Sequence, residues 1–366
     1  MDALSSKFGP ACAQGLAGAP ELDALPLGVA WNALFDRAVD ERAVSIIASA
    51  VVQGLVSATP EQGDQLCTSH EAAMRSCVVL ERWTLDVIRS YVDAGIDVRV
   101  LKGPAVAHLD YPDPSWRTFG DIDVLVPSDR YDDAIRVLLD IGGHRRSEEV
   151  RPGFDRRFGK GACVVLGNGI QVDVHRTLTS GPFGLTIDLP ELFESPDVFH
   201  LAGMPTLALS RELRLIHACY HAVLGDAIPR VVALRDVAQM LESTALNFDE
   251  VRRVASRWRA EIVLARGISL AWSSLKLATT TASDWATGYV GGRFERRALG
   301  AYVGPDRSYA RQMLAGLPAV AGLPAKASYV RSLMFVDPAY AARHGGGFGP
   351  RVRRAWNARP RREHVA

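Results

Sequence analysis

The chain has 366 residues, of which 48% are apolar and 23% charged, a composition typical of globular proteins and unlike disordered, collagenous or coiled-coil chains. A chain of this length can bury a large core without disulfide or metal support. The formal net charge of +1 excludes a global field that would attract nucleic acid or a membrane surface. The charge is uneven, because residues 343–366 are rich in arginine.

The five cysteines are scattered and form no Cys-x-x-Cys pair. This usage predicts reduced thiols in the cytoplasm rather than a disulfide framework or a cysteine zinc site. The first thirty residues contain no basic segment followed by an apolar one, so we expect no signal peptide. The longest uncharged apolar stretches, such as 44–52, are too short to cross a bilayer. We therefore expect a cytoplasmic protein with no membrane partner.

The first elements in chain order are predicted to be helical. Residues 1–26 are rich in alanine, glycine and proline without a period, which predicts a loose N-terminal arm. Two helices are expected after this arm, at 28–57 and 70–94. The second has apolar residues at helical spacing and ends at Gly95.

Alternating strands and short helices are predicted after Gly95. Residues 97–101 predict a strand, and Pro104 is expected to begin a short helix. Residues 121–126 predict a second strand. A helix follows over 129–141, with Ser128 as its N-cap.

A hairpin and a long helical region complete the pattern. Asn168-Gly169 is typical of a tight turn and lies between alternating segments at 162–166 and 170–175. Beyond residue 185 the helical period dominates. Helices are expected at 210–224, 228–243, 248–258 and 260–278. The glycine-rich residues 345–349 predict a flexible break before the basic tail.

The sharpest feature is the segment Gly120-Asp-Ile-Asp-Val-Leu-Val126. Residues two apart in a strand share a face, so Asp121 and Asp123 are expected side by side. Two close carboxylates repel each other unless a cation or solvent compensates, and Mg²⁺ favours a few carboxylate oxygens together with substrate phosphates. The alternative is an exposed strand end with two solvated aspartates.

A third carboxylate follows on the second strand of the hairpin. Alternation within 171–175 places Asp173 and His175 on one face. Three carboxylates on two strands suit two-metal phosphoryl transfer, in which the third holds the ion that activates the attacking hydroxyl. For Asp173 alone, the alternative is a surface aspartate. His175 is expected to ligate metal, to bind a phosphate or to orient Asp173, or else to be a structural histidine.

These motifs resemble one known family. Leu101-Lys102-Gly103, Arg117, the 120–126 segment and Val172–His175 look like the uncharacterised nucleotidyltransferase family, within the polymerase-β-like nucleotidyltransferase superfamily. The resemblance covers roughly 75–240, where three further motifs of the family pattern also occur: His217, His221 and Leu234-Arg235-Asp236.

The resemblance implies a reaction and a set of metal ligands. Asp121, Asp123 and Asp173 would be the catalytic metal carboxylates, and Asp173 would lie nearest to a general base. The superfamily moves a nucleoside monophosphate from a nucleoside triphosphate to a hydroxyl and releases pyrophosphate.

The turn expected to cradle the phosphates departs from the superfamily's usual Gly-Ser or Gly-Gly. Gly103 can form a tight turn and the next helix can present amides to phosphate, although Pro104 lacks an N–H. Lys102 is expected to neutralise the triphosphate, with an ordinary surface lysine as the alternative. We interpret 108–119 as a lid that carries Arg117 to the β- or γ-phosphate. The predicted nucleotide-binding set is Lys102, Gly103, Arg117, Gly120 and His175.

The predicted substrate-binding set consists of His221 and Arg235, which lie on two predicted helices. His221 follows His217 by one helical turn, a spacing that can bind zinc, but no third ligand accompanies these two histidines. We expect their face to line the cleft, where His221 would contact substrate. Arg235 is the second predicted contact, with a buried structural pairing as its alternative.

Two basic segments leave their roles open. Residues 156–160 predict either a basic lip for an anionic substrate or a solvated hairpin shoulder. The tail at 343–366 includes Trp356 and predicts either an RNA-docking arm or a solubilising extension.

The predicted fold class is α+β, with a small mixed β-sheet of the polymerase-β-like nucleotidyltransferase type flanked by N-terminal helices and a C-terminal helical region. The expected parts are an N-terminal arm and helix at 1–70, a nucleotidyltransferase core at 71–184, a helical region forming a cleft wall at 185–342, and a basic flexible tail at 343–366.

We predict a nucleotidyltransferase that depends on Mg²⁺ or Mn²⁺. It would move a nucleoside monophosphate from an NTP, with ATP as the expected donor, to a hydroxyl of a small molecule or peptide. One alternative is an RNA-directed enzyme, toxin-like or processing, that docks through the tail. The other is a non-catalytic interaction protein that keeps the fold. The altered phosphate turn favours this last alternative, whereas the three intact carboxylates oppose it.

Overall fold

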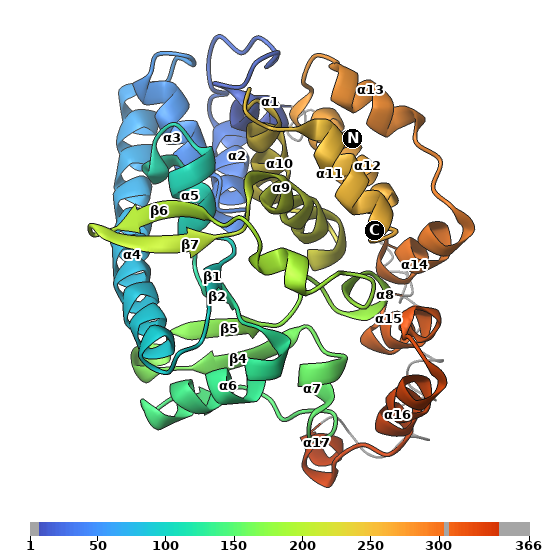
Figure 1. The fold of residues 1–366 in the computed structure, drawn as a ribbon. Helices are drawn as coiled ribbons and strands as arrows, with labels where there is room; N and C mark the ends of the chain where they lie inside the picture. Colours follow the sequence, from blue (N-terminus) through green and yellow to red (C-terminus); the bar gives the residue numbers. More distant parts are fainter. Residues whose placement is uncertain (1–6, 304–306, 344–366) are drawn as a thin grey trace.

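The structure is a computed structural model that describes residues 7–303 and 307–343. Its centre is one mixed sheet of seven strands in the order β3-β4-β5-β2-β1-β7-β6 (Figure 1). The strands are β1 (Arg99–Val100), β2 (Ile122–Leu125), β3 (His144–Arg145), β4 (Gly161–Val165), β5 (Gln171–His175), β6 (Asp197–Leu201) and β7 (Met204–Ala208).

Helices surround this sheet (Figure 1) and make up most of the described chain. They are α1 (Phe8–Ala13), α2 (Val29–Asp40), α3 (Val44–Val52), α4 (Pro60–Asp93), α5 (Pro104–Asp110), α6 (Tyr131–Asp140), α7 (Phe154–Arg157), α8 (Gly181–Gly184), α9 (Arg211–Tyr220), α10 (Val231–Leu241), α11 (Phe248–Arg257), α12 (Glu261–Leu275), α13 (Thr281–Gly288), α14 (Arg293–Val303), α15 (Tyr309–Gly316), α16 (Leu323–Met334) and α17 (Pro338–Arg343). The mixed architecture confirms the α+β prediction. No described helix has the length and the apolar run that a membrane crossing requires.

The two faces of the sheet pack into different cores. Ile122 and Val124 of β2 join Tyr91 of α4 and Leu138 of α6 in one buried cluster. Leu125, on the opposite face, joins a larger cluster with helices of the N- and C-terminal regions, among them α1, α3, α9, α10 and α12. This alternation places Asp123 on the second face, toward α9.

Strand pairing brings distant residues together at the centre of the sheet. β2 runs parallel to β5, with Asp123 opposite Asp173 and Leu125 opposite His175. β1 runs antiparallel to β2 on its other side. The predicted hairpin is confirmed as the antiparallel pair β4–β5, with residues 166–170 as its connection.

The N-terminal region corrects three predictions. Residues 7–26 are not a loose arm, because α1 is buried along its whole length and Phe8 is 1% exposed. The expected helix at 28–57 is two helices, α2 and α3, that turn at residues 41–43. A third helix, α4, starts ten residues earlier than the expected start at residue 70, because Thr59 and Gln62 form a capping box there.

Two further corrections concern the middle of the chain. Ser128 is not the N-cap of α6. It begins a 3₁₀ turn over 128–130, and its hydroxyl donates to the carbonyl of Arg156 at 3.0 Å. The strands β6 and β7 lie where only helical character was expected, and they extend the sheet beyond residue 184. The expected break at 345–349 and the tail that follows lie outside the described residues.

Candidate active site

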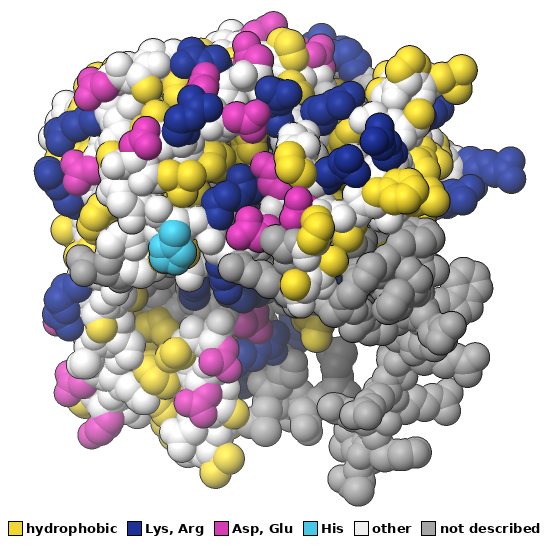
Figure 2. Space-filling view, turned by 90° about the horizontal axis from the view of Figure 1, so that it is seen from below, with side chains coloured by type: hydrophobic (Ala, Val, Ile, Leu, Met, Phe, Trp, Pro, Cys, Tyr) yellow, Lys and Arg dark blue, Asp and Glu magenta, His cyan; other side chains and the backbone are white. Residues whose placement is uncertain are grey.

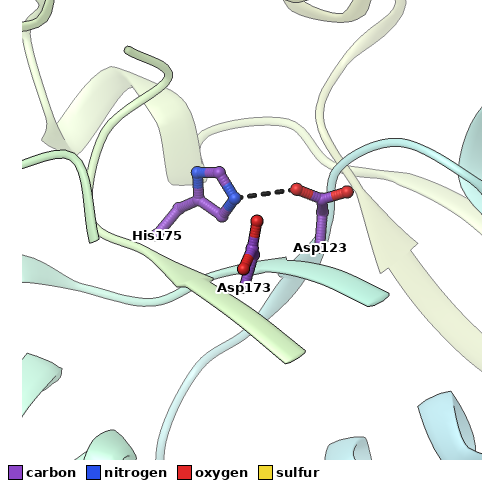
Figure 3. Close-up of side chains that lie close together, drawn as sticks. All are labelled: Asp123, Asp173 and His175. Carbon is purple, nitrogen blue, oxygen red and sulfur yellow. Dashed lines mark hydrogen bonds and ion pairs between the residues drawn. The ribbon is translucent and has the colours of Figure 1, made fainter. Parts of the chain in front are cut away.

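The centre of the site is set by the parallel register of β2 and β5. Val124, Val172 and Val174 are fully buried, which fixes which face each strand turns to the core. The intervening residues Asp123 and Asp173 must therefore project together from the opposite face. Figure 3 shows these two side chains with His175, all reaching into one space above the strands.

Asp123 is the most enclosed of the carboxylates, at 3% exposure. One carboxylate oxygen, Oδ1, lies 2.8 Å from Nε2 of His175, and the other lies 3.0 Å from Nζ of Lys102. Burial alone would raise its pKa, but Lys102 and His175 outweigh burial and hold the pKa well below its usual range. Asp123 is therefore ionised at any physiological pH.

Lys102 reaches this carboxylate because of the turn after β1. The Leu101 amide donates to the carbonyl of Asp123 at 3.0 Å, which holds the next residue against β2. Gly103 then turns the chain with φ +56°, a conformation that favours glycine, and Pro104 begins α5 as expected. Burial lowers the pKa of Lys102, but Asp123 and Asp121 outweigh it, so the pKa is raised and the ammonium stays charged.

The carboxylates form a site whose donors fit a divalent cation. Asp123, Asp173 and His175 each offer one ligand atom, and these atoms lie within 4.8 Å of one another. Asp121 is not in this group of three ligands. Burial and the charge of Asp123 both raise the pKa of Asp121, so its carboxylate interacts electrostatically with the group. Carboxylate oxygens are the donors that Mg²⁺ and Mn²⁺ favour, so the residues fit such an ion.

Among the described residues, His175 forms its side-chain hydrogen bond with Asp123 and not with Asp173, the partner suggested by the sequence. It is 2% exposed, and its Nδ1 has no hydrogen-bond partner among the described residues. Burial first, and then the charge of Lys160, lower its pKa. With Nε2 protonated, the ring donates to the Asp123 carboxylate and orients it.

The end of α9 carries the two histidines His217 and His221. His217 is buried there, and a π-helical turn begins at His221. Burial and the charge of Lys102 hold the pKa of both histidines well below the usual value, so both rings are neutral. The charges of Lys102, Asp123 and Lys160 all act on the pKa of His221, and its contact with substrate stays a prediction.

Lys160 faces the same site from the start of β4. Burial and the neighbouring charge of Lys102 lower its pKa, while Asp123 and Asp173 act against this. Its position depends on Gly161, because a Cβ there would lie 2.0 Å from the carbonyl oxygen of Val174. This residue had only been expected in a basic lip, and the sequence offered no signal that Gly161 fits β4 against β5.

Arg117 holds two parts of the fold together. Arg117 is 5% exposed, and its guanidinium donates to both carboxylate oxygens of Asp236 in α10, at 2.8 and 2.9 Å. The hydroxyl of Tyr111 donates to the same carboxylate at 2.9 Å. The interpretation of 108–119 as a lid that carries Arg117 to the phosphates is therefore wrong, because these buried contacts anchor the segment. In this pairing Arg117 does not reach into the carboxylate site.

Arg235 also differs from its predicted role. It is 1% exposed, and its Nη1 donates to the carbonyls of Cys12 and Gln14 at 2.8 and 2.9 Å. The other terminal nitrogen donates to Gln239 at 2.9 Å. A direct contact with substrate is excluded in this arrangement. The guanidinium instead fixes α1 and the residues after it onto α10, which matches the structural alternative.

Residues 28–275 match the family described as uncharacterised nucleotidyltransferase. The match covers more than half of the chain and includes every residue of the carboxylate site. The chain belongs to this family.

Membership makes the protein a nucleotidyltransferase and implies an NTP substrate. The match begins before α2 and ends with α12, so it extends further on both sides than the expected 75–240. The helices at 28–57 are thus part of the nucleotidyltransferase itself. No curated protein matches the chain.

Solved structures of other nucleotidyltransferases show weak similarity. A crystal structure of ANT(2″)-Ia in complex with adenylyl-2″-tobramycin has 14% identity and a TM-score of 0.33, covering 50% of this chain and 97% of that one. A nucleotidyltransferase-like protein from Paracoccidioides brasiliensis has 15% identity and a TM-score of 0.32, covering 57% of this chain and 96% of that one. At these values the similarity transfers no residue role to this chain.

Proposed function

We propose that this nucleotidyltransferase moves a nucleoside monophosphate from an NTP to a hydroxyl, with a divalent cation held by Asp121, Asp123 and Asp173. The observation that carries the proposal is the register of β2 and β5, which sets Asp123 directly opposite Asp173. Two carboxylates set opposite each other on neighbouring strands repel each other unless positive charge compensates them. Lys102 pairs with Asp123, and a bound divalent cation would compensate the remaining negative charge.

The chain's residues take distinct parts in the proposed reaction. Asp121, Asp123 and Asp173 would hold the cation, which would supply charge stabilisation at the reacting phosphate. His175 and Lys102 orient Asp123 and keep it ionised. The acceptor oxygen bonds to the α-phosphorus as the bond to pyrophosphate breaks, and Asp173 takes the hydroxyl proton. Lys102 and Lys160 bring positive charge to the departing pyrophosphate.

We propose ATP as the donor and a small molecule or peptide as the acceptor, and a cytoplasmic location. Free thiols at all five cysteines support a reducing compartment. An RNA acceptor has less support, because Figure 2 shows basic and acidic side chains interspersed on the face that it presents. A non-catalytic role also has less support, because the three carboxylates are all present and interact electrostatically with one another.

The test is thermal unfolding with each of the four NTPs, with and without Mg²⁺. We expect one NTP to raise the midpoint in a Mg²⁺-dependent way, because a ligand that binds only the folded state stabilises it. Asp121→Ala/Asp123→Ala should abolish that shift, whereas the control Asp133→Asn, on the exposed face of α6, should retain it. Asp123→Asn should abolish transfer while the protein stays folded. A protein that binds no NTP, or an active Asp123→Asn variant, would contradict the proposal.

A further inference from the structure

Arg42 lies at the corner between α2 and α3 in a backbone conformation that suits glycine. Its φ is +57°, which an arginine adopts only at a cost in free energy. The corner is fixed from the other side by Glu41, whose carboxylate accepts from the backbone N–H of Val231, the first residue of α10, at 2.6 Å. A strained residue held this firmly suggests that the direction of its side chain matters.

The side chain of Arg42 lies on the glycine that precedes Asp121. A Cβ at Gly120 would lie 2.6 Å from Nη2 and 2.8 Å from Cζ of Arg42, so only glycine allows this approach. The positive charge of Arg42 lowers the pKa of Asp121, against the larger effects of burial and Asp123. The guanidinium therefore lies at the rim of the carboxylate site, beside Asp121.

The Arg42 guanidinium is not committed to another protein group. It is solvent-exposed, and within the described chain its side chain forms no hydrogen bond or ion pair. The other arginine expected near the phosphates, Arg117, is closed off by Asp236. Lys102 is paired with Asp123. The fork of guanidinium N–H donors in Arg42 thus remains available to a ligand.

We infer that Arg42 binds the phosphate chain of the NTP, on the β- and γ-phosphates that leave as pyrophosphate. The inference rests on the proposed function, because it places these phosphates beside the carboxylates. A guanidinium presents several donors in a plane that matches phosphate oxygens. Gly120, by lacking a side chain, leaves room for the Arg42 guanidinium at this position. The helices before the core thereby supply part of the nucleotide site.

The test measures affinity for inorganic pyrophosphate, the four NTPs and the four nucleoside monophosphates by calorimetry in Mg²⁺. Arg42→Gln should weaken pyrophosphate and the bound NTP by about tenfold or more, the usual effect of losing a hydrogen bond to a charged group, and leave the monophosphates nearly unchanged. Arg42→Lys should fall between. Arg136→Gln, an exposed arginine on α6, is the matched control and should bind as wild type does.

A second variant separates binding from a structural role. Arg42→Gly relieves the strained φ, so we expect a melting midpoint equal to or above that of wild type together with the same loss of pyrophosphate affinity. A lowered midpoint with unchanged affinity would show a structural arginine and overturn the inference. Wild type that binds NTP no better than Arg42→Gln would also overturn it and spare the proposed function. Wild type that binds neither NTP nor pyrophosphate would overturn both.

Discussion

Asp236→Asn should destabilise the fold strongly, because it leaves a buried guanidinium without a counter-charge. The side chains of Arg117 and Asp236 are 6% and 5% exposed, and two hydrogen bonds join them. An amide offers only one acceptor to this guanidinium, and it carries no charge. The Tyr111 hydroxyl loses the same carboxylate as its acceptor.

The expected loss follows from burial. Breaking a buried ion pair by removing one partner costs about 3–5 kcal/mol, because the remaining charge stays out of water. Folded domains have a free energy of unfolding of only about 5–15 kcal/mol, so the variant loses a large share of it. The exposed Asp133 provides the comparison. It pairs with Arg130 at 3.1 Å and with Arg136 at 2.9 Å while its side chain is 42% exposed, so Asp133→Asn should lower the free energy of unfolding far less than Asp236→Asn does.

Urea denaturation, followed by fluorescence and by circular dichroism, measures both variants. Coincident transitions with an unchanged slope would justify comparing the free energies of unfolding. The triple variant Arg117→Met/Asp236→Leu/Tyr111→Phe removes the whole polar group and should recover most of the loss, since an apolar set of similar volume replaces a buried pair at little cost. If Asp236→Asn were no more harmful than Asp133→Asn, the reasoning from burial would be refuted.

Two further predictions concern buried charges away from the carboxylates. Arg235→Met leaves the carbonyls of Cys12 and Gln14 without their donor, so we expect a loss of about 2–3 kcal/mol and faster limited proteolysis within residues 7–26. Equal cleavage rates would contradict the anchoring role. Burial, and next the charge of Glu149, raise the pKa of Asp155 from 3.8 to about 6, so the folded protein holds this proton more tightly than the unfolded chain. Its contribution to stability is therefore present below about pH 4 and is lost as the pH rises through 6, by roughly 2–3 kcal/mol, and Asp155→Asn should remove this decline from the pH–stability profile. A decline of equal size in wild type and variant would show that another group causes it.

The carboxylates were predictable because their signal is local. Within 121–126 and within 171–175, the alternation of side chains along a strand determines the face of the sheet to which each aspartate points. This holds independently of the rest of the fold. Their neighbours were not predictable in the same way. Orienting Asp173, two residues away in the sequence, was one of the roles expected for His175, but the parallel register lets it reach Asp123 across the strands. Register depends on the packing of both faces, which no single segment encodes.

The missed strands β6 and β7 show a second limit. Their connection is Ala202-Gly203, and both residues have positive φ, at +45° and +81°. This is the backbone of a tight two-residue hairpin turn, in which asparagine or aspartate usually precedes the glycine. With alanine in that place and Pro205 within β7, the segment lacks the residues that normally signal a hairpin. Buried neighbours outweigh these weak local preferences.

The same reasoning explains the burial of α1. Its residues, from Phe8 to Ala13, are small or apolar on every side, so no period of polar and apolar residues marks a helix face. A helix that is apolar on all sides is stable only when other elements bury it, and the sequence of the helix alone does not show which elements these are. Arg235 provides a polar anchor for its end, and the family match that begins at residue 28 does not extend to it.

The balance of charge at the site gives the strongest physical reason to expect a cation. Of the three carboxylates, Asp123 is already neutralised by Lys102 and held by His175. Asp121 retains a raised pKa, first from burial and then from Asp123, so its negative charge is not fully compensated by the protein. Holding the uncompensated Asp121 carboxylate beside the buried Asp123 carboxylate lowers the free energy of unfolding. A bound divalent cation would offset this loss of stability. Arg42 and Lys160, which face the same carboxylates without forming an ion pair in the described chain, are then placed for the phosphates that such a cation brings.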